Sequence, residues 1–315
     1  MIRCLFCADS HFRATNPPSY RVDYLDRLKV IFQSLSNHLE DNNYAIHIFG
    51  GDVFDSPLIA TGRVLNTARI LFDLGYYKEW EVVPGQHDGS LRQDKMDCIL
   101  VNLESDQFHV HWIPYITTIS DGEWEEEIGL IPHGFIEETR ERYFGDIIVV
   151  HEDIFPSVGD ATIGTVRLSE MKHRPKLVLA GHQHYPDGVI KAGETQIVIP
   201  GSMGRITRTD AMAPVYAVSV EIEEGEVGKI ELIKLADGLT SDDLLSSEDA
   251  LIAERAFSER QEAIAVLQNI SKKTDLASAE DMLVDLIFEL QLADDPVAAD
   301  QEAVSLATNT VRKHT

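Results

Sequence analysis

Short apolar runs alternate with longer segments of helical periodicity through the first 200 residues of the chain. Between Tyr24 and Asp41, leucine and phenylalanine recur at spacings of three and four, which predicts an amphipathic helix with one buried face. A second helix is predicted at residues 61–76. Strands are predicted at residues 2–8, 44–51, 80–85, 127–134, 146–152, 176–184 and 195–202. This strand–helix–strand alternation indicates a layered α/β fold.

Beyond residue 200 the pattern changes twice. Residues 214–223 and 228–236 predict a pair of strands joined by the acidic turn EGEVG. From about Ser246 the chain becomes rich in Ala, Leu, Glu and Asp at helical spacing. Helices are predicted at residues 247–270, 278–292 and 297–312. We therefore expect a domain of residues 1–236 and an acidic helical C-terminal region of residues 237–315.

The negative charge of the chain limits how it can bind a phosphate group. The 315 residues are 44% hydrophobic and 25% charged, as in an ordinary globular protein, but the formal net charge is −26. Residues 237–315 alone hold 17 acidic and 6 basic side chains. Such a surface does not attract nucleic acid by itself, so phosphate chemistry needs positive charge from metal ions, local arginines or a partner.

The sequence gives no sign of a membrane segment. No apolar run approaches the roughly 18 residues of a membrane span. The start, MIRCLFCADSH, has too short an apolar stretch for a signal peptide and runs directly into Asp9 and His11. We therefore expect a cytoplasmic protein that does not bind a membrane.

Five of the predicted strands end in residues of the kinds that bind metal ions. The motifs are D-S-H with Asp9 and His11, G-G-D-V-F-D with Asp52 and Asp55, G-Q-H-D with Gln86, His87 and Asp88, H-E with His151, and G-H-Q-H with His182 and His184. Ligands bind at the carboxyl ends of strands in α/β sheets, so these side chains are expected in one crevice. A pair of divalent ions about 3.5–4 Å apart needs mixed carboxylate and imidazole ligands and one bridging carboxylate. The motifs therefore predict a dinuclear metal site for phosphoester hydrolysis, and this ligand set suits manganese or iron best.

Taken in this order, the five motifs resemble those of the calcineurin-like metallophosphoesterases. GGDVFD and PGSMGRITRTD (200–210) further resemble the SbcD-type nuclease subunit of the double-strand-break-repair exonucleases, over roughly residues 1–235. The motifs also fit phage-encoded relatives of this group. The resemblance implies a four-layer αββα sandwich, two manganese ions, a homodimer and an SMC-like ATPase partner of SbcC type. The helical C-terminal region would then include a docking element for the coiled coil of that ATPase.

Carried over motif by motif, the resemblance assigns two sets of metal ligands. One ion would be held by Asp9, His11, Asp52 and His184, and the other by Asp52, Gln86, His151 and His182. His87 resembles the family histidine that contacts the phosphate or protonates the leaving oxygen. Two interpretations stay open for Asp88, which either orients His87 by hydrogen bonding or caps its own loop. Asp55 is expected to brace its loop rather than to bind metal.

Gln86 stands where the family has asparagine. Both residues offer an amide oxygen to a metal, but glutamine is longer by one methylene. In one interpretation Gln86 still binds the second ion, and in the other it points away and water takes its place. Because every other ligand is present, we favour a working site. Arg205 and Arg208, which follow the last strand of the sheet, are expected to contact the backbone of a nucleic acid.

Three functions compete on this evidence. The leading hypothesis is a metal-dependent DNA exonuclease or endonuclease that processes DNA ends in repair or recombination with an ATPase partner. The acidic charge favours an alternative, a stand-alone phosphodiesterase or phosphatase acting on nucleotides or phosphoproteins. The third hypothesis is a weakly active scaffold that binds DNA ends or a partner, with Gln86 as the sign of its lost activity.

Overall fold

A computed structural model describes most of the N-terminal three quarters of the chain. The described residues are 1–14, 17, 22–56, 62–73, 79–89, 99–103, 105, 108–120, 122, 125–157, 159–206 and 213–236. The chain divides into two units, Met1–Leu244 and Leu245–Thr315, and all described residues belong to the first. The helices expected in residues 237–315 lie outside the described residues, so that region and its boundary stay predictions.

The first large sheet contains the strands that bear the first three motifs. Its strands are β1 (Ile2–Cys7), β2 (Ile46–Phe49), β3 (Trp80–Val82), β4 (Phe108–Val110), β14 (Tyr216–Glu223) and β15 (Glu226–Lys234). Their order is β15-β14-β1-β2-β3-β4. Strands β1 to β4 run parallel, whereas β14 is antiparallel to β1 and forms the predicted hairpin with β15. The first three motifs therefore follow neighbouring strands at the same end of the sheet.

The second large sheet contains the strands that bear the last two motifs. Its strands are β5 (Tyr115–Ser120), β6 (Glu125–Ile131), β7 (Ile147–His151), β11 (Leu177–Gly181), β12 (Gly188–Ala192) and β13 (Thr195–Ile199). Their order is β12-β13-β11-β7-β6-β5, with four parallel central strands and an antiparallel strand at each edge. Because β7 and β11 are parallel neighbours, His151 and the G-H-Q-H motif also lie at one end.

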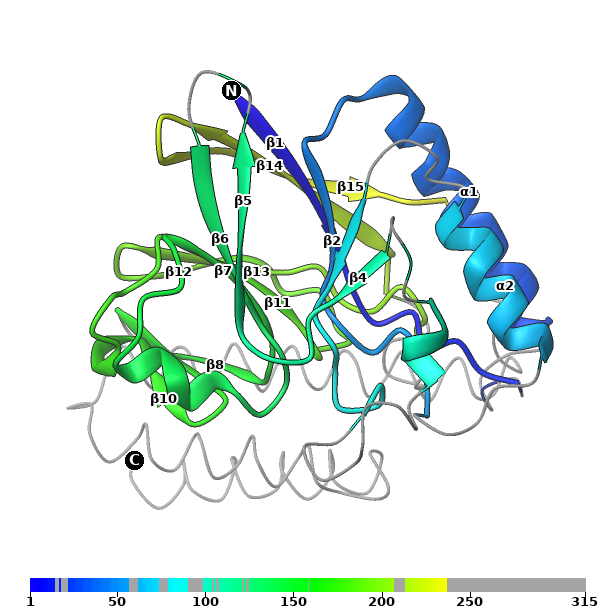
Figure 1. Cartoon of the computed structure of the whole chain (residues 1–315), viewed down its shortest axis with the longest axis horizontal. Coiled ribbons are helices and arrows are strands. Elements are labelled where there is room, and N and C mark those ends of the chain that lie inside the picture. The colour runs from blue at the N-terminus through cyan, green and yellow to red at the C-terminus, as the bar shows by residue number, and fades with distance from the viewer. Residues whose placement is uncertain are drawn as a thin grey trace, which may run out of the picture. The chain divides into compact units, whose positions relative to one another are not determined.

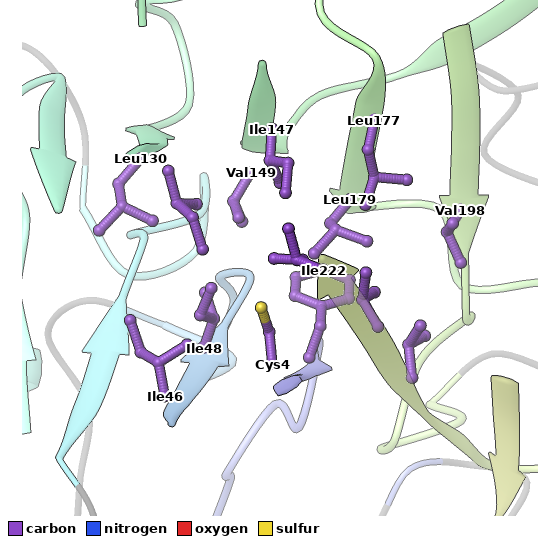
Figure 2. Close-up of a cluster of buried hydrophobic side chains, with 14 of the residues drawn as sticks. Cys4, Ile46, Ile48, Leu130, Ile147, Val149, Leu177, Leu179, Val198 and Ile222 are labelled. Atoms are coloured by element: carbon purple, nitrogen blue, oxygen red, sulfur yellow. The ribbon is translucent and has the colours of Figure 1, made fainter. Parts of the chain in front are cut away.

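The two sheets pack face to face over an apolar core. Figure 2 shows Cys4, Ile46 and Ile48 of the first sheet facing residues such as Val149 and Leu179 of the second. All five side chains are at most 5% exposed. Inward-facing residues alternate along each strand, as expected where two sheets share a core. This packing holds the ends of the two sheets in a fixed relation.

Two helices cover the outer face of the first sheet. These are α1 (Tyr24–Asp41) and α2 (Gly62–Asp73), which lie side by side (Figure 1). The carboxylate of Asp23 caps α1 by accepting from the amides of Leu25 and Asp26, at 3.0 and 3.1 Å. The ring of Phe72 in α2 packs on Phe32 of α1 and on three aromatic rings of the sheet, with centroids 4.8–5.5 Å apart. The helical layer is thus anchored by aromatic packing.

The outer face of the second sheet carries a different layer in the described residues. A small sheet of β8 (Ile154–Ser157), β9 (Asp160–Ile163) and β10 (Val166–Arg167) packs there with the short 3₁₀ helices η3 (Ile136–Arg140) and η4 (Leu168–Glu170). A further 3₁₀ helix, η2 (Ile99–Leu103), precedes β4.

The predicted sandwich of two large sheets is confirmed. In the described residues, the second outer layer consists of short strands and 3₁₀ turns. Among the described helices, none has the length and apolar character to span a membrane.

Gly181 at the end of β11 permits a close approach between the two sheets. A Cβ at this position would overlap the carbonyl oxygen of Gly50 and lie 2.9 Å from Nδ1 of His151. We expect Gly181→Ala to lower the free energy of unfolding by about 1–3 kcal/mol, because the backbone oxygen it meets cannot move alone. Urea unfolding in the presence of a chelator measures this change.

Gly62→Ala is the matched control for this substitution. Gly62 begins α2, and a Cβ there meets no described atom within 4 Å. This variant should be neutral or more stable by up to about 1 kcal/mol, since alanine restricts the unfolded chain. Parent-like stability of Gly181→Ala would contradict the packing described above.

Candidate metal centre

The carboxyl ends of β1, β2, β3, β7 and β11 bring the predicted ligands together. In three groups of side chains, one potential ligand atom from each member lies within 4.8 Å of those of the other members. The groups are Asp9, His11 and His184; His11, Asp52 and His87; and Asp52, His151 and His182. Because His11 and Asp52 each belong to two groups, the three form one continuous cluster that joins both sheets.

The loops that bear these side chains have an uncommon backbone conformation. Asp9, His11, Asp52 and His182 have positive φ values of 60°, 46°, 49° and 84°. Only two other non-glycine residues in the described ranges do so. This region costs free energy for residues with a Cβ, and such residues gather at functional sites. The sharp turns at the strand ends place these side chains in the cluster.

Backbone contacts lock the loop after β1 to the loop after β2. The amides of Asp9 and His11 donate to the carbonyl oxygens of Gly51 and Asp52, both at 2.9 Å. The loop after β3 also lies close to the loop after β2, since a Cβ on Gly85 would overlap Oδ1 of Asp52. The glycines of the second and third motifs are therefore needed for the loops to approach one another.

Asp9, His11 and His184 form one half of the cluster. Asp9 is fully buried, and the backbone amide of His182 lies 3.2 and 3.1 Å from its two carboxylate oxygens. Nε2 of His11 faces Nε2 of His184 at 2.9 Å. The same atom of His11 lies 3.9 Å from Oδ1 of Asp9 and 3.8 Å from Oδ2 of Asp52. Imidazole and carboxylate atoms thus converge on one region.

Asp52, His151 and His182 form the other half. Nδ1 of His151 donates to the carbonyl oxygen of Gly50 at 2.6 Å, which directs Nε2 of the ring into the cluster. That Nε2 lies 3.2 Å from Oδ2 of Asp52. The rings of His151 and His182 meet edge to face with centroids 5.2 Å apart. Asp52 therefore faces histidines of both halves.

Several buried polar atoms of the cluster have no hydrogen-bond partner among the described residues. They are Nδ1 of His11, Oδ2 of Asp52, Nε2 of His151 and Nδ1 of His182. Buried polar atoms are nearly always paired, and each exception costs about 1–3 kcal/mol. Nδ1 of His11 faces Oδ1 of Asp55 at 3.8 Å, whereas its Nε2 faces the other ligands. The other three are atom types that bind divalent metals, so a cation would satisfy them. The residues present fit a metal centre.

Burial and charge shift the pKa values in the cluster in opposite directions. Burial alone would raise the pKa of Asp52, but His151 and His11 hold it below its usual range. Burial would lower the pKa of His151, yet the charges of Asp52 and Asp9 raise it to about 10. In His11 burial prevails and the pKa falls well below its ordinary value. Metal ions bind ionised carboxylates and neutral imidazoles, so a cation near His151 replaces its proton.

His87 lies at the rim of the cluster. It is half-buried, and its backbone amide donates to Oδ1 of Asp52 at 2.8 Å. Nδ1 of the ring is 3.0 Å from the carbonyl oxygen of Asp55, and the ring meets that of His11 edge to face at 5.2 Å. A proton on Nδ1 donated to Asp55 leaves Nε2 for a substrate. This arrangement suits contact with a phosphate.

The contacts of Asp88 favour one of the two interpretations that the sequence left open. The buried carboxylate of Asp88 accepts from the backbone amides of Val53, Phe54 and Gly85, at 3.2, 2.9 and 3.0 Å. Burial, together with the charge of Asp52, raises its pKa to about 7. Asp88 therefore braces the loops after β2 and β3, which is the second of the two interpretations left open by the sequence.

Gln86 is the one predicted ligand that is exposed. It lies in the turn of residues 86–88, whereas the other predicted ligands are buried or half-buried. Exposure favours the interpretation in which its amide points away from the other ligands. Its part in metal binding stays a prediction.

The structure also corrects the role expected for Arg205. This residue is only 3% exposed, and its Nη1 donates to the carbonyl oxygen of Ala213. The guanidinium therefore binds a backbone group inside the protein and is not accessible to a nucleic acid. Arg208 lies outside the described residues, and its predicted contact stays a prediction.

The segment GSMGR, which follows β13, braces the site instead. Oγ of Ser202 and the amide of Gly204 donate to the carbonyl oxygen of Asp9, at 2.7 and 2.9 Å. The amide of Ser202 donates to the carbonyl oxygen of His184 at 2.9 Å. This segment thus holds the backbone of ligands from both sheets, through the hydroxyl and amide of Ser202 and the amide of Gly204.

Two partners of the ligands were not predicted from the sequence. One is the carbonyl oxygen of Gly50, a backbone group that a sequence pattern does not indicate. The other is Asp153, whose Oδ1 lies 3.2 Å from Nε2 of His182. Its place two residues after His151, in the segment HED, was the available signal.

A separate group of Glu79, Glu81 and His109 also places potential ligand atoms close together. It borders a cavity of about 320 Å³ that β5 residues help to line. The carboxylate of Glu81 already pairs with His111 and, at 3.4 Å, with His109. Because both carboxylate oxygens of Glu81 already have histidine partners, this group does not indicate a second metal site.

Two solved structures are similar to this chain at low sequence identity. A candidate 5′-nucleotidase from Staphylococcus aureus, solved with α-ketoglutarate, is 14% identical with a TM-score of 0.48 over 81% of this chain and 57% of its own. A 5′-nucleotidase precursor from Thermus thermophilus is 14% identical with a TM-score of 0.43, over 83% and 59% respectively. This chain thus spans less than two thirds of either protein.

The sequence itself matches a family model. No curated protein sequence matches the chain. The model of the calcineurin-like phosphoesterases matches residues 2–186, which include all five motifs. This range includes Asp52, the histidines that surround it, and the loops in which glycine permits close backbone approach. The chain belongs to the calcineurin-like phosphoesterase family.

Proposed function

We propose that this phosphoesterase cleaves phosphodiester bonds in DNA with two divalent metal ions, manganese being the expected pair. The observation that carries the two-metal part is the position of Asp52, whose Oδ2 lies 3.8 Å from Nε2 of His11 in one half of the cluster and 3.2 Å from Nε2 of His151 in the other. The choice of DNA is supported by the resemblance of GGDVFD and PGSMGRITRTD to the SbcD-type nucleases.

The ligand sets follow from the two halves of the cluster. Asp9, His11, Asp52 and His184 would hold one ion, and Asp52, His151 and His182 the other, with water in the place that the resemblance gives to the amide of Gln86. When bound, two such ions neutralise phosphate charge and make a nearby water more acidic. The protein itself fixes the ligand geometry through the loops braced by Asp88 and Ser202.

His87 is the residue of this chain that we expect to act on the substrate. Its backbone is tied to Asp52 and its Nδ1 to the carbonyl oxygen of Asp55, so the ring is positioned before a substrate arrives. Nε2 can then contact a phosphate oxygen or give a proton to the leaving oxygen. Such proton transfer contributes about 10²–10⁴-fold to a rate.

The acidic surface argues for a partner. With a net charge of −26, the chain repels a DNA backbone at long range. The two metal ions neutralise charge only at the point of cleavage. We therefore propose that an SMC-like ATPase of SbcC type delivers the DNA, as the motif resemblance implies.

The same negative charge supports a second candidate function, hydrolysis of small phosphoesters such as nucleotides. A small substrate needs no basic groove, because the metal ions can hold its single phosphate group. A manganese-dependent assay with end-labelled duplex and single-stranded DNA, a chromogenic phosphodiester and a chromogenic phosphomonoester separates the candidates. Cleavage of DNA supports our proposal. Turnover of the monoester alone would favour the second candidate, and DNA binding without turnover of any substrate would indicate a scaffold.

His87→Ala should lower manganese-dependent hydrolysis of the preferred substrate about a hundredfold or more, because it removes the group that meets the phosphate. His173→Ala is the matched control, since His173 is exposed and its ring packs edge to face on Tyr143 rather than on a residue of the cluster. Steady-state rates of the two variants beside the parent test this expectation. Equal rates for parent and His87→Ala would remove His87 from the reaction.

Gln86→Asn should keep or raise manganese-dependent hydrolysis. Asparagine retains the amide oxygen and is shorter by one methylene, which restores the family pattern at this position. Gln33→Asn makes the same chemical change on the exposed face of α1 and should leave the rate unchanged. A collapse of activity in Gln86→Asn alone would show that the glutamine has a specific role in this enzyme.

A further inference from the structure

The two histidines that flank Asp52 in the second half of the cluster use different ring nitrogens to contact a partner outside the predicted ligands. His151 donates from Nδ1 to Gly50, so its Nε2 faces Oδ2 of Asp52 at 3.2 Å. In His182 the arrangement is reversed. Its Nε2 lies 3.2 Å from Oδ1 of Asp153, while its Nδ1 is buried and has no hydrogen-bond partner in the described part of the chain.

Asp153 is held in place by backbone contacts that do not involve the side chains of the predicted metal ligands. Its carbonyl oxygen accepts from the amide of Gly164 at 2.8 Å. The next residue, Ile154, is bound on both sides by the side-chain amide of Gln183. Oε1 of Gln183 accepts from the amide of Ile154 at 3.2 Å, and its Nε2 donates to the carbonyl oxygen at 3.4 Å.

Gln183 therefore has a specific task within the motif G-H-Q-H. It lies between the two predicted ligands His182 and His184 and ties their loop to the loop that follows β7. Because Asp153 belongs to that second loop, the clamp keeps its carboxylate beside the ring of His182. The carboxylate remains partly exposed, with 32% of its side chain accessible.

We propose that Asp153 is a positioning residue of the metal centre, which accepts the Nε2 proton of His182 and so makes Nδ1 the metal-binding atom of that ring. A neutral imidazole carries its proton on one nitrogen only, so a carboxylate beside Nε2 fixes the tautomer and turns the lone pair of Nδ1 into the cluster. It also makes the ring a stronger ligand. The proposal rests on the metal centre of the proposed function and is independent of DNA as the substrate.

The tautomer can be measured in the metal-free protein. In ¹⁵N-histidine-labelled protein, two-bond proton–nitrogen correlations distinguish a protonated Nε2 from a protonated Nδ1, and His182→Gln identifies the signal. We expect His182 to carry its proton on Nε2. Asp153→Ala should lose this preference, whereas Asp153→Asn, which keeps an acceptor oxygen, should retain it. A proton on Nδ1 of His182 in the parent would overturn the proposal.

Calorimetric titration with Mn²⁺ provides the second readout. Asp153→Ala should weaken the binding of one of the two ions about ten- to a hundredfold and leave the other unchanged. Asp153→Asn should give an intermediate loss, and it keeps the test available if the alanine variant does not fold. Asp146→Asn is the matched control, because Asp146 pairs with Lys176 at 3.1 Å, just before β7 begins and away from its ligand-bearing end.

The outcomes separate this proposal from the choice of substrate. Parent-like affinity for both ions in Asp153→Ala, or equal weakening of both, would overturn the positioning role. The selective loss of one ion in a protein that never cleaves DNA would support it, and would reject only DNA as the substrate.

Discussion

The burial of two carboxylates that have no lysine or arginine partner in the described part of the chain is the constraint on which the site depends. Asp9 and Asp52 are both fully buried, and among the described residues their ionic partners are histidines. A buried charge costs several kcal/mol unless it is paired or binds a metal. The surrounding imidazoles meet part of this need, and the unpartnered Oδ2 of Asp52 and Nε2 of His151 are atoms of the kinds that bind metal ions. The fold therefore contains a negative centre that a pair of cations completes.

The packing of two sheets makes this centre possible. Ligands come from the ends of β1 and β2 in one sheet and of β7 and β11 in the other, so no single layer could form it. The apolar core fixes the distance between the sheets, and glycines at the strand ends allow backbone atoms to approach. Buried polar groups such as Asp88 and Ser202 then tie the loops to one another. The strained φ values are tolerated because so many contacts determine these loops.

The sequence was sufficient for features that depend on local pattern. The helix α1 was predicted over its full length, because its apolar stripe is regular. The ligand motifs could be recognised since each follows a buried strand. The edge strands β5 and β12 were missed, since their half-exposed residues give no clear alternation. The role of Arg205 was wrongly anticipated, and the choice between the two roles of Asp88 stayed open, for a different reason. Their partners, such as the amide of Phe54 and the carbonyl of Ala213, are backbone groups whose proximity only the folded chain creates.

The central claim is that one carboxylate, Asp52, is shared by two metal ions. Anomalous diffraction at the manganese absorption edge, from crystals grown with Mn²⁺, tests this claim directly. We predict two anomalous peaks, one beside His11 and His184 and the other beside His151 and His182, both in contact with the carboxylate of Asp52. A single peak, or a pair of which one lies away from Asp52, would contradict the account.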